Sequence, residues 1–323
     1  MVAQPNALFL FVKNRLDNVA NILLFFSKYP YSIFVLDDSS ELAIQKQIKS
    51  LAKANKNVTY VGVEFYKDFV SELNLDTKAH NFLLQELGKE QWNLGYSRNL
   101  ALVIAKRYKF KGVGFIDDDI MIDDSSLIPS MFNLLDKYAF SGSNIIGLRD
   151  DSVVGHISYE LGYPSKNMIS GGFMFFQPSQ IEYYFLNVYN EDWIWIIMHL
   201  NKYNFIVNDA VTQIYRSPYF EVEKKIEFQE LGEVILNGVL FAYENDQFIN
   251  SWDNNSWEMI IRNRIMYLSE LVDKSKSENK VDFSNIIELS ISAAKGIAYD
   301  NLNGFIKQYY DNLGSFRSAY STL

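Results

Sequence analysis

The first 120 residues alternate between short apolar runs and segments whose apolar residues recur at helical spacing. The apolar runs predict buried strands at residues 7–12, 32–36, 58–63 and 112–116. The segments between them predict helices at residues 16–28, 41–55 and 97–108. Strands that alternate with helices form a mostly parallel sheet, and such sheets bind ligands beyond the carboxyl ends of their strands. We therefore expect an α/β fold with a Rossmann-like, mostly parallel mixed sheet flanked by helices.

Composition narrows the classes of protein to which the chain can belong. With 323 residues, 48% of them hydrophobic, the chain can bury a large core. A formal charge of −9 argues against a nucleic-acid partner. No apolar run approaches the ~20 residues of a membrane span, and the N-terminus lacks the basic start of a signal peptide. The absence of cysteine excludes disulfides and thiolate chemistry and fits a reducing compartment. We expect a cytoplasmic protein without a transmembrane segment.

Three consecutive carboxylates, Asp117, Asp118 and Asp119, follow the apolar run 112–116. Neighbouring carboxylates repel by about 3 kcal/mol at ~5 Å and an effective dielectric of ~20, so this triplet requires a compensating cation. Oxygen ligands without nearby cysteine favour Mg²⁺ or Mn²⁺, which usually share their coordination sphere with substrate phosphates. The triplet predicts a metal–diphosphate site, with a solvated turn as the alternative. Asp123 and Asp124 are interpreted as the cap of a helix that starts near Leu127.

Two further elements of the first half carry charge near predicted strand or helix ends. Asp37 and Asp38 follow a predicted strand, where they either cap the next helix or contact a nucleotide. Arg98 lies near the start of a predicted helix, where a cation is unfavourable. It either points at a diphosphate or base, or forms a buried pair with an aspartate. Asn99 is expected to support the local backbone.

The character of the sequence changes beyond residue 140, where longer loops separate mixed strands. We expect a strand at 173–176, a helix that Pro178 opens, a helix at about 193–203, and two short strands near 205–207 and 211–215. Beyond residue 221 the pattern is helical, and the polar run 273–280 predicts a linker. These features divide the chain into residues 1–220 and a helical C-terminal region, 221–323.

Four elements in chain order resemble the family 2 type of nucleotide-sugar glycosyltransferases, which have the GT-A fold. The first is Val35-Leu36-Asp37-Asp38-Ser39-Ser40, similar to the turn that holds the base and ribose of the sugar donor. The second, residues 93–101, is similar to the family's segment of glycine, arginine and asparagine. The third is the acidic triplet, similar to the metal motif. The fourth is Gly171-Gly172 followed by Glu191-Asp192, similar to the acceptor-side glycines and the acidic pair that carries the base. The resemblance covers residues 7–217.

The resemblance implies a metal-dependent glycosyltransferase that moves a sugar from a nucleotide-diphosphate donor, UDP-sugar favoured, to an acceptor hydroxyl with inversion. Mn²⁺ or Mg²⁺ is the implied cofactor, with Asp119 and Asp117 as ligands. Gln213 stands about where many relatives carry a histidine ligand, and a glutamine oxygen can coordinate the ion without adding charge. The implied donor-binding residues are Asp37, Asp38, Arg98, Asp117 and Asp118.

On the acceptor side, the resemblance implies Asp192 as general base, together with Glu191. The alternative for both is that they are favourable acids in the first turn of a helix. Gly171, Gly172 and Trp193 are the implied acceptor contacts, although core packing is an alternative for Trp193 and for Trp195. His156, in the predicted loop 150–167, is a further candidate for contacting acceptor or phosphate. His80 and His199 are interpreted as structural.

Two other function classes remain open at this stage. A nucleotidyltransferase of related fold also needs carboxylates and a metal, but residues 10–17 contain none of the glycines expected in its N-terminal loop. The third class is a non-catalytic protein that binds a nucleotide-sugar. It remains open because Gln213 replaces the histidine ligand of many relatives. The acceptor is expected to be a saccharide or small molecule. The C-terminal helices can bind it, pack on the sheet or form a homodimer.

Overall fold

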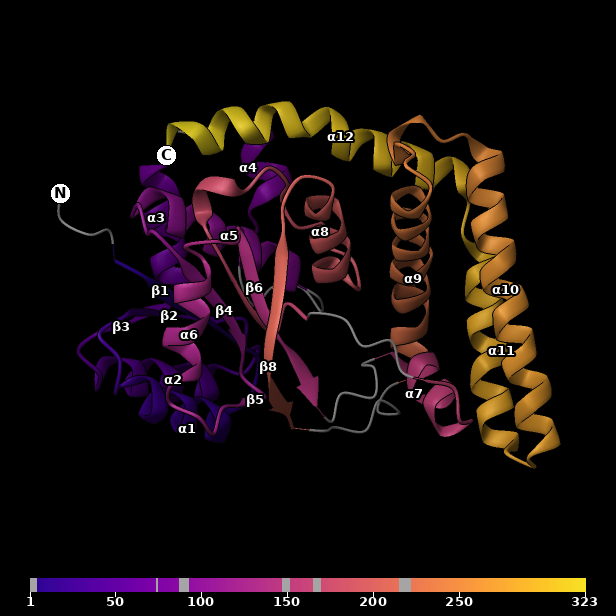
Figure 1. Ribbon diagram of the computed structural model, residues 1–323, viewed down its shortest axis with the longest axis horizontal. Coiled ribbons are helices and arrows are strands. Elements are labelled where there is room, and N and C mark those ends of the chain that lie inside the picture. Colours follow the sequence, from indigo (N-terminus) through magenta and orange to yellow (C-terminus); the bar gives the residue numbers. More distant parts are fainter. Residues whose placement is uncertain (1–4, 74, 87–92, 147–151, 165–169, 215–221) are drawn as a thin grey trace.

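A computed structural model describes residues 5–73, 75–86, 93–146, 152–164, 170–214 and 222–323. In it, an eight-stranded sheet is flanked by helices on both faces (Figure 1). The strands are β1 (Ala7–Val12), β2 (Ser32–Asp37), β3 (Val58–Val61), β4 (Val113–Asp117), β5 (Ile120–Met121), β6 (Phe140–Ile146), β7 (Phe173–Phe176) and β8 (Phe205–Gln213).

The strand order is β3-β2-β1-β4-β7-β6-β8-β5. The first four strands in this order are mutually parallel, as the alternation of strands and helices predicts. β7 lies antiparallel to both β4 and β6, β6 is parallel to β8, and β5 pairs antiparallel with β8. The expectation of a mostly parallel mixed sheet is therefore confirmed, and the carboxyl ends of β1, β2 and β4 share one edge.

In the first two thirds of the chain, the structure describes the helices α1 (Leu16–Phe26), α2 (Leu42–Lys53), α3 (Val63–Glu72), α4 (Thr77–Leu83), α5 (Leu94–Arg107), α6 (Leu127–Leu134), α7 (Val153–Glu160) and α8 (Glu191–Leu200). Most of them cover the two faces of the sheet, whereas α7 packs against helices of the C-terminal region. β1 explains why both faces are covered, because its side chains alternate between two apolar clusters. Phe9 and Phe11 pack towards α5, and Leu8 and Leu10 pack towards α1 and α6.

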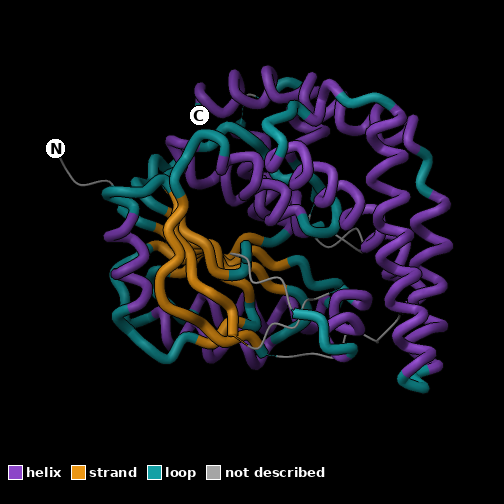
Figure 2. Tube along the Cα trace, turned by 45° about the vertical axis from the view of Figure 1, so that its right-hand side comes forward, coloured by secondary structure: helices purple, strands orange, loops and turns teal. Residues whose placement is uncertain are grey.

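The C-terminal helices extend one of these cores. They are α9 (Val222–Glu244), α10 (Asn254–Ser277), α11 (Val281–Gly296) and α12 (Tyr299–Thr322). Val234, Trp257 and Phe316 belong to the same buried cluster as Phe9 and Phe115. α12 runs back across the molecule to the sheet domain, where Tyr309 and Tyr320 donate hydrogen bonds to backbone oxygens of residues 184 and 178 (Figures 1 and 2). The predicted domain boundary between residues 220 and 221 falls within residues 215–221, which are outside the described part of the chain.

Three local predictions are wrong. The polar run 273–280 is not a linker, since α10 continues to Ser277 and a turn with Asn279 at φ +58° leads directly into α11. Apart from the buried Ser275, the polar residues there lie on the solvent side of a helical hairpin whose inner side buries Leu271 and Val272. Pro178 opens only a single 3-10 turn, Pro178–Gln180.

The third correction concerns the strands near 205–207 and 211–215, which form one strand, β8. A register shift opposite Gly142 and Asn144 absorbs Asn208-Asp209, where Asp209 has a φ of +62°. Tyr215 lies outside the described residues. Among the described helices, none is long and apolar enough to cross a membrane.

Candidate active site

The acidic triplet lies at the carboxyl edge of the sheet, where β4 ends and turns into β5. The backbone N–H of Asp118 donates to the carbonyl of Phe11 on β1 (3.2 Å), and that of Asp117 donates to the carbonyl of Gly172 (2.9 Å). The triplet is therefore held against both neighbouring strands. Asp118 and Asp119 are buried, with 3% and 6% of their surface exposed, which argues against a solvated turn.

Two cations in the loop after β1 pair with acids at this edge, Arg15 with the triplet and Lys13 with the Asp37-Asp38 turn. The Arg15 guanidinium bridges Asp118 and Asp119, at 2.5 and 2.6 Å. The Lys13 ammonium lies 2.9 Å from a carboxylate oxygen of Asp38. Sequence reasoning missed both residues. A signal was present, because they directly follow a central strand whose carboxyl end shares the edge with the triplet.

The Asp37-Asp38 turn does not cap the following helix. α2 begins at Leu42, and its N-cap position makes no side-chain hydrogen bond. Instead Asp37 accepts hydrogen bonds from the Tyr60 hydroxyl (2.8 Å) and the Ser39 backbone (3.0 Å). Asp38 also accepts from the side chain of Asn93 at 3.3 Å. The turn is fixed beside the triplet, linked to it through the loop of Lys13 and Arg15.

Arg98 connects the triplet to the acidic pair at the start of α8. Only 1% of its surface is exposed. Its guanidinium lies 2.5 Å from a Glu191 oxygen, 3.4 Å from one of Asp117 and 3.9 Å from one of Asp192. Arg98 thus forms a buried ion pair with acids, the alternative to a ligand contact that the sequence left open. Its shortest contact is with Glu191. Arg98 therefore positions carboxylates on both sides of the site.

Asn99 supports the backbone as expected. Its side chain donates to the carbonyl of Phe185 (2.9 Å) and accepts from the N–H of the same residue (2.7 Å). This two-way contact anchors the segment that leads into α8.

The glycine pair fills the space between these groups. A Cβ on Gly171 would lie 2.6 Å from Cβ of Asp192 and 2.7 Å from a guanidinium nitrogen of Arg98. A Cβ on Gly172 would lie 3.0 Å from a carboxylate oxygen of Asp117. The Gly171 N–H donates to Asp192 at 2.7 Å. These glycines permit close approach of the acidic residues, so any larger residue displaces the candidate base.

Asp192 and Glu191 have different surroundings. One oxygen of Asp192 accepts from Gly171 and the other accepts from the backbone of Trp193 (2.8 Å), which orients the carboxylate. Its side chain is 15% exposed. Glu191 is 3% exposed, and its burial raises the pKa of its carboxyl to about 8, against the opposing effect of Arg98. Of the pair, Asp192 is the one with access to a ligand.

Two carboxylates of the triplet, Asp117 and Asp118, have raised pKa values, and burial is the largest cause for both. Partial burial raises the pKa of Asp117 to about 6, with Arg98 lowering it and Asp119 raising it further. Burial raises the pKa of Asp118 to about 7, although Arg15 lowers it. Both carboxylates are thus costly to ionise without more positive charge.

Four buried side-chain oxygens of this edge have no hydrogen-bond partner among the described residues. One, Oδ1 of Asn93, lies on the side chain that donates to Asp38, and the other three are Oδ1 of Asp117, Oδ1 of Asp119 and Oε1 of Gln213. Gln213 is brought to the triplet by the pairing of β5 with β8, in which Ile120 lies opposite Gln213 and the N–H of Ile214 donates to the Asp119 carbonyl (2.9 Å). Buried acceptors without partners are rare, and hard oxygen atoms are the ligands of Mg²⁺ and Mn²⁺.

The described residues contain no group of three or more histidine, cysteine, aspartate or glutamate side chains arranged for a metal. Two carboxylates and one amide are a sparser set, which fits ions that complete their sphere with substrate phosphate and water. The donor set of Asp117, Asp119 and Gln213 therefore fits a hard divalent cation.

The remaining candidates lie outside this cluster. His156 is not in a loop: Ser152 caps α7 by accepting from Gly155 (2.9 Å), and His156 is buried within that helix. Trp195 is a core residue, 1% exposed, whereas Trp193 is partly buried and lines a cavity. His199 is buried in α8 and His80 lies in α4. Asp124 accepts from the Ser126 backbone (2.7 Å) just before α6.

Comparisons with known proteins concern the fold. No protein-family model matches the chain, and no curated protein matches it. Among solved structures it is similar to a mannosyltransferase from Pyrobaculum calidifontis in complex with GDP-Man and Mn²⁺, with a TM-score of 0.51 and 9% identity, over 97% of this chain and 87% of that one. This likeness shows that the chain has the fold of that glycosyltransferase, as the resemblance to GT-A enzymes implies.

Two weaker likenesses have TM-scores below 0.4. One is to a putative nucleotide-diphospho-sugar transferase from Desulfovibrio desulfuricans, with a TM-score of 0.38 and 11% identity, over 72% of this chain and 96% of that one. The other is to a cytidylyltransferase from Leptospira borgpetersenii, with a TM-score of 0.37 and 13% identity, over 77% of this chain and 98% of that one.

Proposed function

We propose that the chain is a divalent-metal-dependent glycosyltransferase that uses a nucleotide-diphosphate sugar and inverts the anomeric centre. The observation that carries this proposal is the trio of unpartnered buried oxygens on Asp117, Asp119 and Gln213. The trio lies at the same edge of the sheet as the Asp37-Asp38 turn, and Arg98 contacts both Asp117 and the oriented carboxylate of Asp192. A divalent cation held by these three residues would supply positive charge to the diphosphate leaving group.

The chain's own residues divide the remaining work. Asp37 and Asp38, fixed by Tyr60 and Asn93, are the proposed contacts of the donor nucleoside. Lys13 and Arg15 already lie on carboxylates at this edge and provide positive charge for the diphosphate. Arg98 holds Asp117 and Glu191 in place from beneath the site.

Asp192 is the proposed general base. Inverting transfer requires one carboxylate to take the proton of the acceptor hydroxyl while its oxygen attacks the anomeric carbon opposite the leaving diphosphate. Backbone donors at 2.7 and 2.8 Å fix one rotamer of Asp192, and Arg98 bridges it to the triplet through a shared guanidinium. This linkage supports placing base and leaving-group site on opposite sides of one sugar.

The test is release or transfer of sugar from UDP- and GDP-sugars with and without Mn²⁺. Wild type should act on at least one donor only with the metal present, and Asp119→Asn should lose that activity. Asp123→Asn is the matched control, since Asp123 is an exposed acid four residues farther on. Nucleotide binding without turnover of any donor would instead favour a non-catalytic binding protein. Pyrophosphate release from a nucleoside triphosphate and a sugar phosphate would identify a nucleotidyltransferase.

A further inference from the structure

A cavity of about 560 Å³ lies between α7, the start of α8, α9 and α10. Trp193 lines it and is the next residue after Asp192, whose carboxylate accepts from the Trp193 backbone. Figure 1 shows α7 lying at the foot of α9 and beside α10 and α11. The volume is in the range of small-ligand sites, which are ~300–1,000 Å³.

The walls of this cavity are physically joined to the start of α8. Asn190, directly before Glu191, has a φ of +62° and donates from its side chain to Glu233 of α9 (3.1 Å). α9 also packs without a gap on the preceding backbone, because a Cβ on Gly232 would lie 2.3 Å from the carbonyl oxygen of Tyr189. The cavity and the candidate base therefore share one rigid support.

The lining combines flat aromatic surface with carboxamides. Trp193, Phe241 and Tyr267 supply the aromatic surface. The half-buried Asn237 and the exposed Asn263 also line the cavity. Each carboxamide can donate to and accept from a hydroxyl group, and aromatic rings pack on the apolar face of a sugar ring. This combination suits a saccharide.

The charge of the lining selects among saccharides. Arg264 is the basic residue of the lining, and its guanidinium is consumed by a two-point contact with Glu230 (2.8 and 2.9 Å) and a third contact with Glu233 (3.3 Å). Glu233 and Glu244 also line the cavity. The lining therefore carries a net negative charge. It would repel a phosphorylated or carboxylated acceptor, because its described residues offer no cation that is not already paired with an acid.

We propose that this cavity is the acceptor subsite of the proposed transferase and that its acceptor is a neutral saccharide. The inference rests on the proposed function and adds the place and chemical class of the acceptor. The C-terminal helices α9 and α10 then serve as the acceptor-binding part of the protein.

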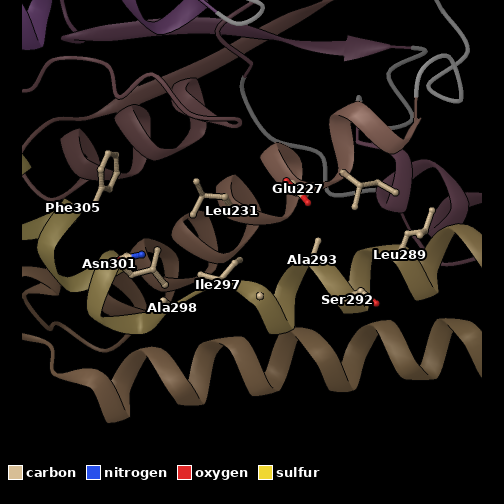
Figure 3. A pocket seen from close by; sticks show the side chains of 12 residues that line it. Glu227, Leu231, Leu289, Ser292, Ala293, Ile297, Ala298, Asn301 and Phe305 are labelled. Atoms are coloured by element: carbon tan, nitrogen blue, oxygen red, sulfur yellow. The ribbon is translucent and has the colours of Figure 1, made fainter.

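A larger cavity, about 840 Å³, lies between α9, α11 and α12 (Figure 3). Leu231, Leu289 and Phe305 give it an apolar lining, and no residue of α8 or of the triplet reaches it. It serves as the internal control, because Asn301 lines it as Asn237 lines the smaller cavity.

The experiment measures transfer from the active donor to p-nitrophenyl glycosides of glucose, galactose and mannose, and to the corresponding sugar 1-phosphates. Wild type should transfer to at least one neutral glycoside, with lower efficiency towards every sugar phosphate. Asn237→Ala and Asn263→Ala should each raise the acceptor KM roughly threefold to tenfold, the range for one lost hydrogen bond. Metal-dependent donor hydrolysis should stay within about twofold, and Asn301→Ala should change neither quantity.

The outcomes separate the two proposals. Donor hydrolysis with transfer only to sugar phosphates, or to none of the acceptors, overturns the neutral-saccharide subsite and leaves the transferase proposal standing. An unchanged acceptor KM in both asparagine variants overturns the location. Absence of donor hydrolysis and of metal-dependent nucleotide binding in wild type overturns the proposed function itself.

Discussion

Replacing Gln213 with methionine should stabilise the metal-free protein and strongly reduce its stabilisation by Mn²⁺. The side-chain oxygen of Gln213 is buried without a hydrogen-bond partner among the described residues. A buried unsatisfied polar group costs about 1–3 kcal/mol, and methionine removes it with little change in shape. We expect the free energy of unfolding of the metal-free protein to rise by about 1 kcal/mol, or ~2 °C in melting temperature for a chain of this size.

The response to metal should change in the opposite direction. A ligand that binds only the folded state stabilises it by about 2.7 kcal/mol at one hundred times its dissociation constant. Wild type should therefore melt several degrees higher in excess Mn²⁺. Gln213→Met should gain much less, because one of the protein ligands is missing.

Gln229→Met is the matched control. Gln229 is buried, but its oxygen accepts from the backbone of Val153 at 3.2 Å. Its loss should destabilise the metal-free protein by about 1–2 kcal/mol and leave the Mn²⁺ response intact. Thermal melting of the three proteins with EDTA and with Mn²⁺ gives all the values. A Gln213→Met protein that is less stable than wild type, and that keeps the full Mn²⁺ shift, would refute the reasoning.

Three further perturbations test separate parts of the account. Gly171→Ala places a methyl group 2.6 Å from Cβ of Asp192. It should lower the free energy of unfolding, measured with denaturant, by about 1–3 kcal/mol and remove most of the transfer rate. A variant with wild-type turnover would contradict the packing argument. Asp192→Asn should lower kcat about 10²- to 10⁴-fold while donor affinity in calorimetry changes little, and equal losses in both would indicate a binding role. Burial lowers the pKa of His199 to about 4, so its contribution to stability is present above about pH 6.5 and is lost as the pH falls to 4. Between pH 6.5 and 4, the free energy of unfolding of wild type should fall by about 3 kcal/mol more than that of His199→Gln. Parallel stability–pH profiles of the two proteins would refute a neutral buried histidine.

The parallel part of the sheet was predictable because β1, β2 and β4 are buried on both faces. Such strands appear in sequence as continuous apolar runs, and four runs correspond to β1 to β4. The antiparallel insertion of β7 between β4 and β6 was not predictable, since the neighbouring strands determine the direction in which a short apolar strand pairs.

The polar composition of 273–280 was misleading, because each helix of a helical hairpin exposes one side to solvent.

The candidate site was partly predictable from its acids. Asp37, Asp38 and the triplet follow strands whose carboxyl ends share an edge, so their proximity follows from the parallel sheet. The partners of Arg98 could not be chosen from sequence, because a buried ion pair and a ligand contact require the same residue type. Arg15 was overlooked although it follows a strand that ends at the same edge; its two contacts with the triplet, at 2.5 and 2.6 Å, were not specified by that position alone.

The central claim is that Asp117, Asp119 and Gln213 hold a divalent cation at a nucleotide-diphosphate site. The most direct measurement is an anomalous difference map from crystals grown with MnCl₂ and either UDP or GDP. The account predicts one manganese peak within bonding distance of Oδ1 of Asp117, Oδ1 of Asp119 and Oε1 of Gln213, bridged to the diphosphate. An ordered nucleotide with no manganese at these three oxygens would contradict it.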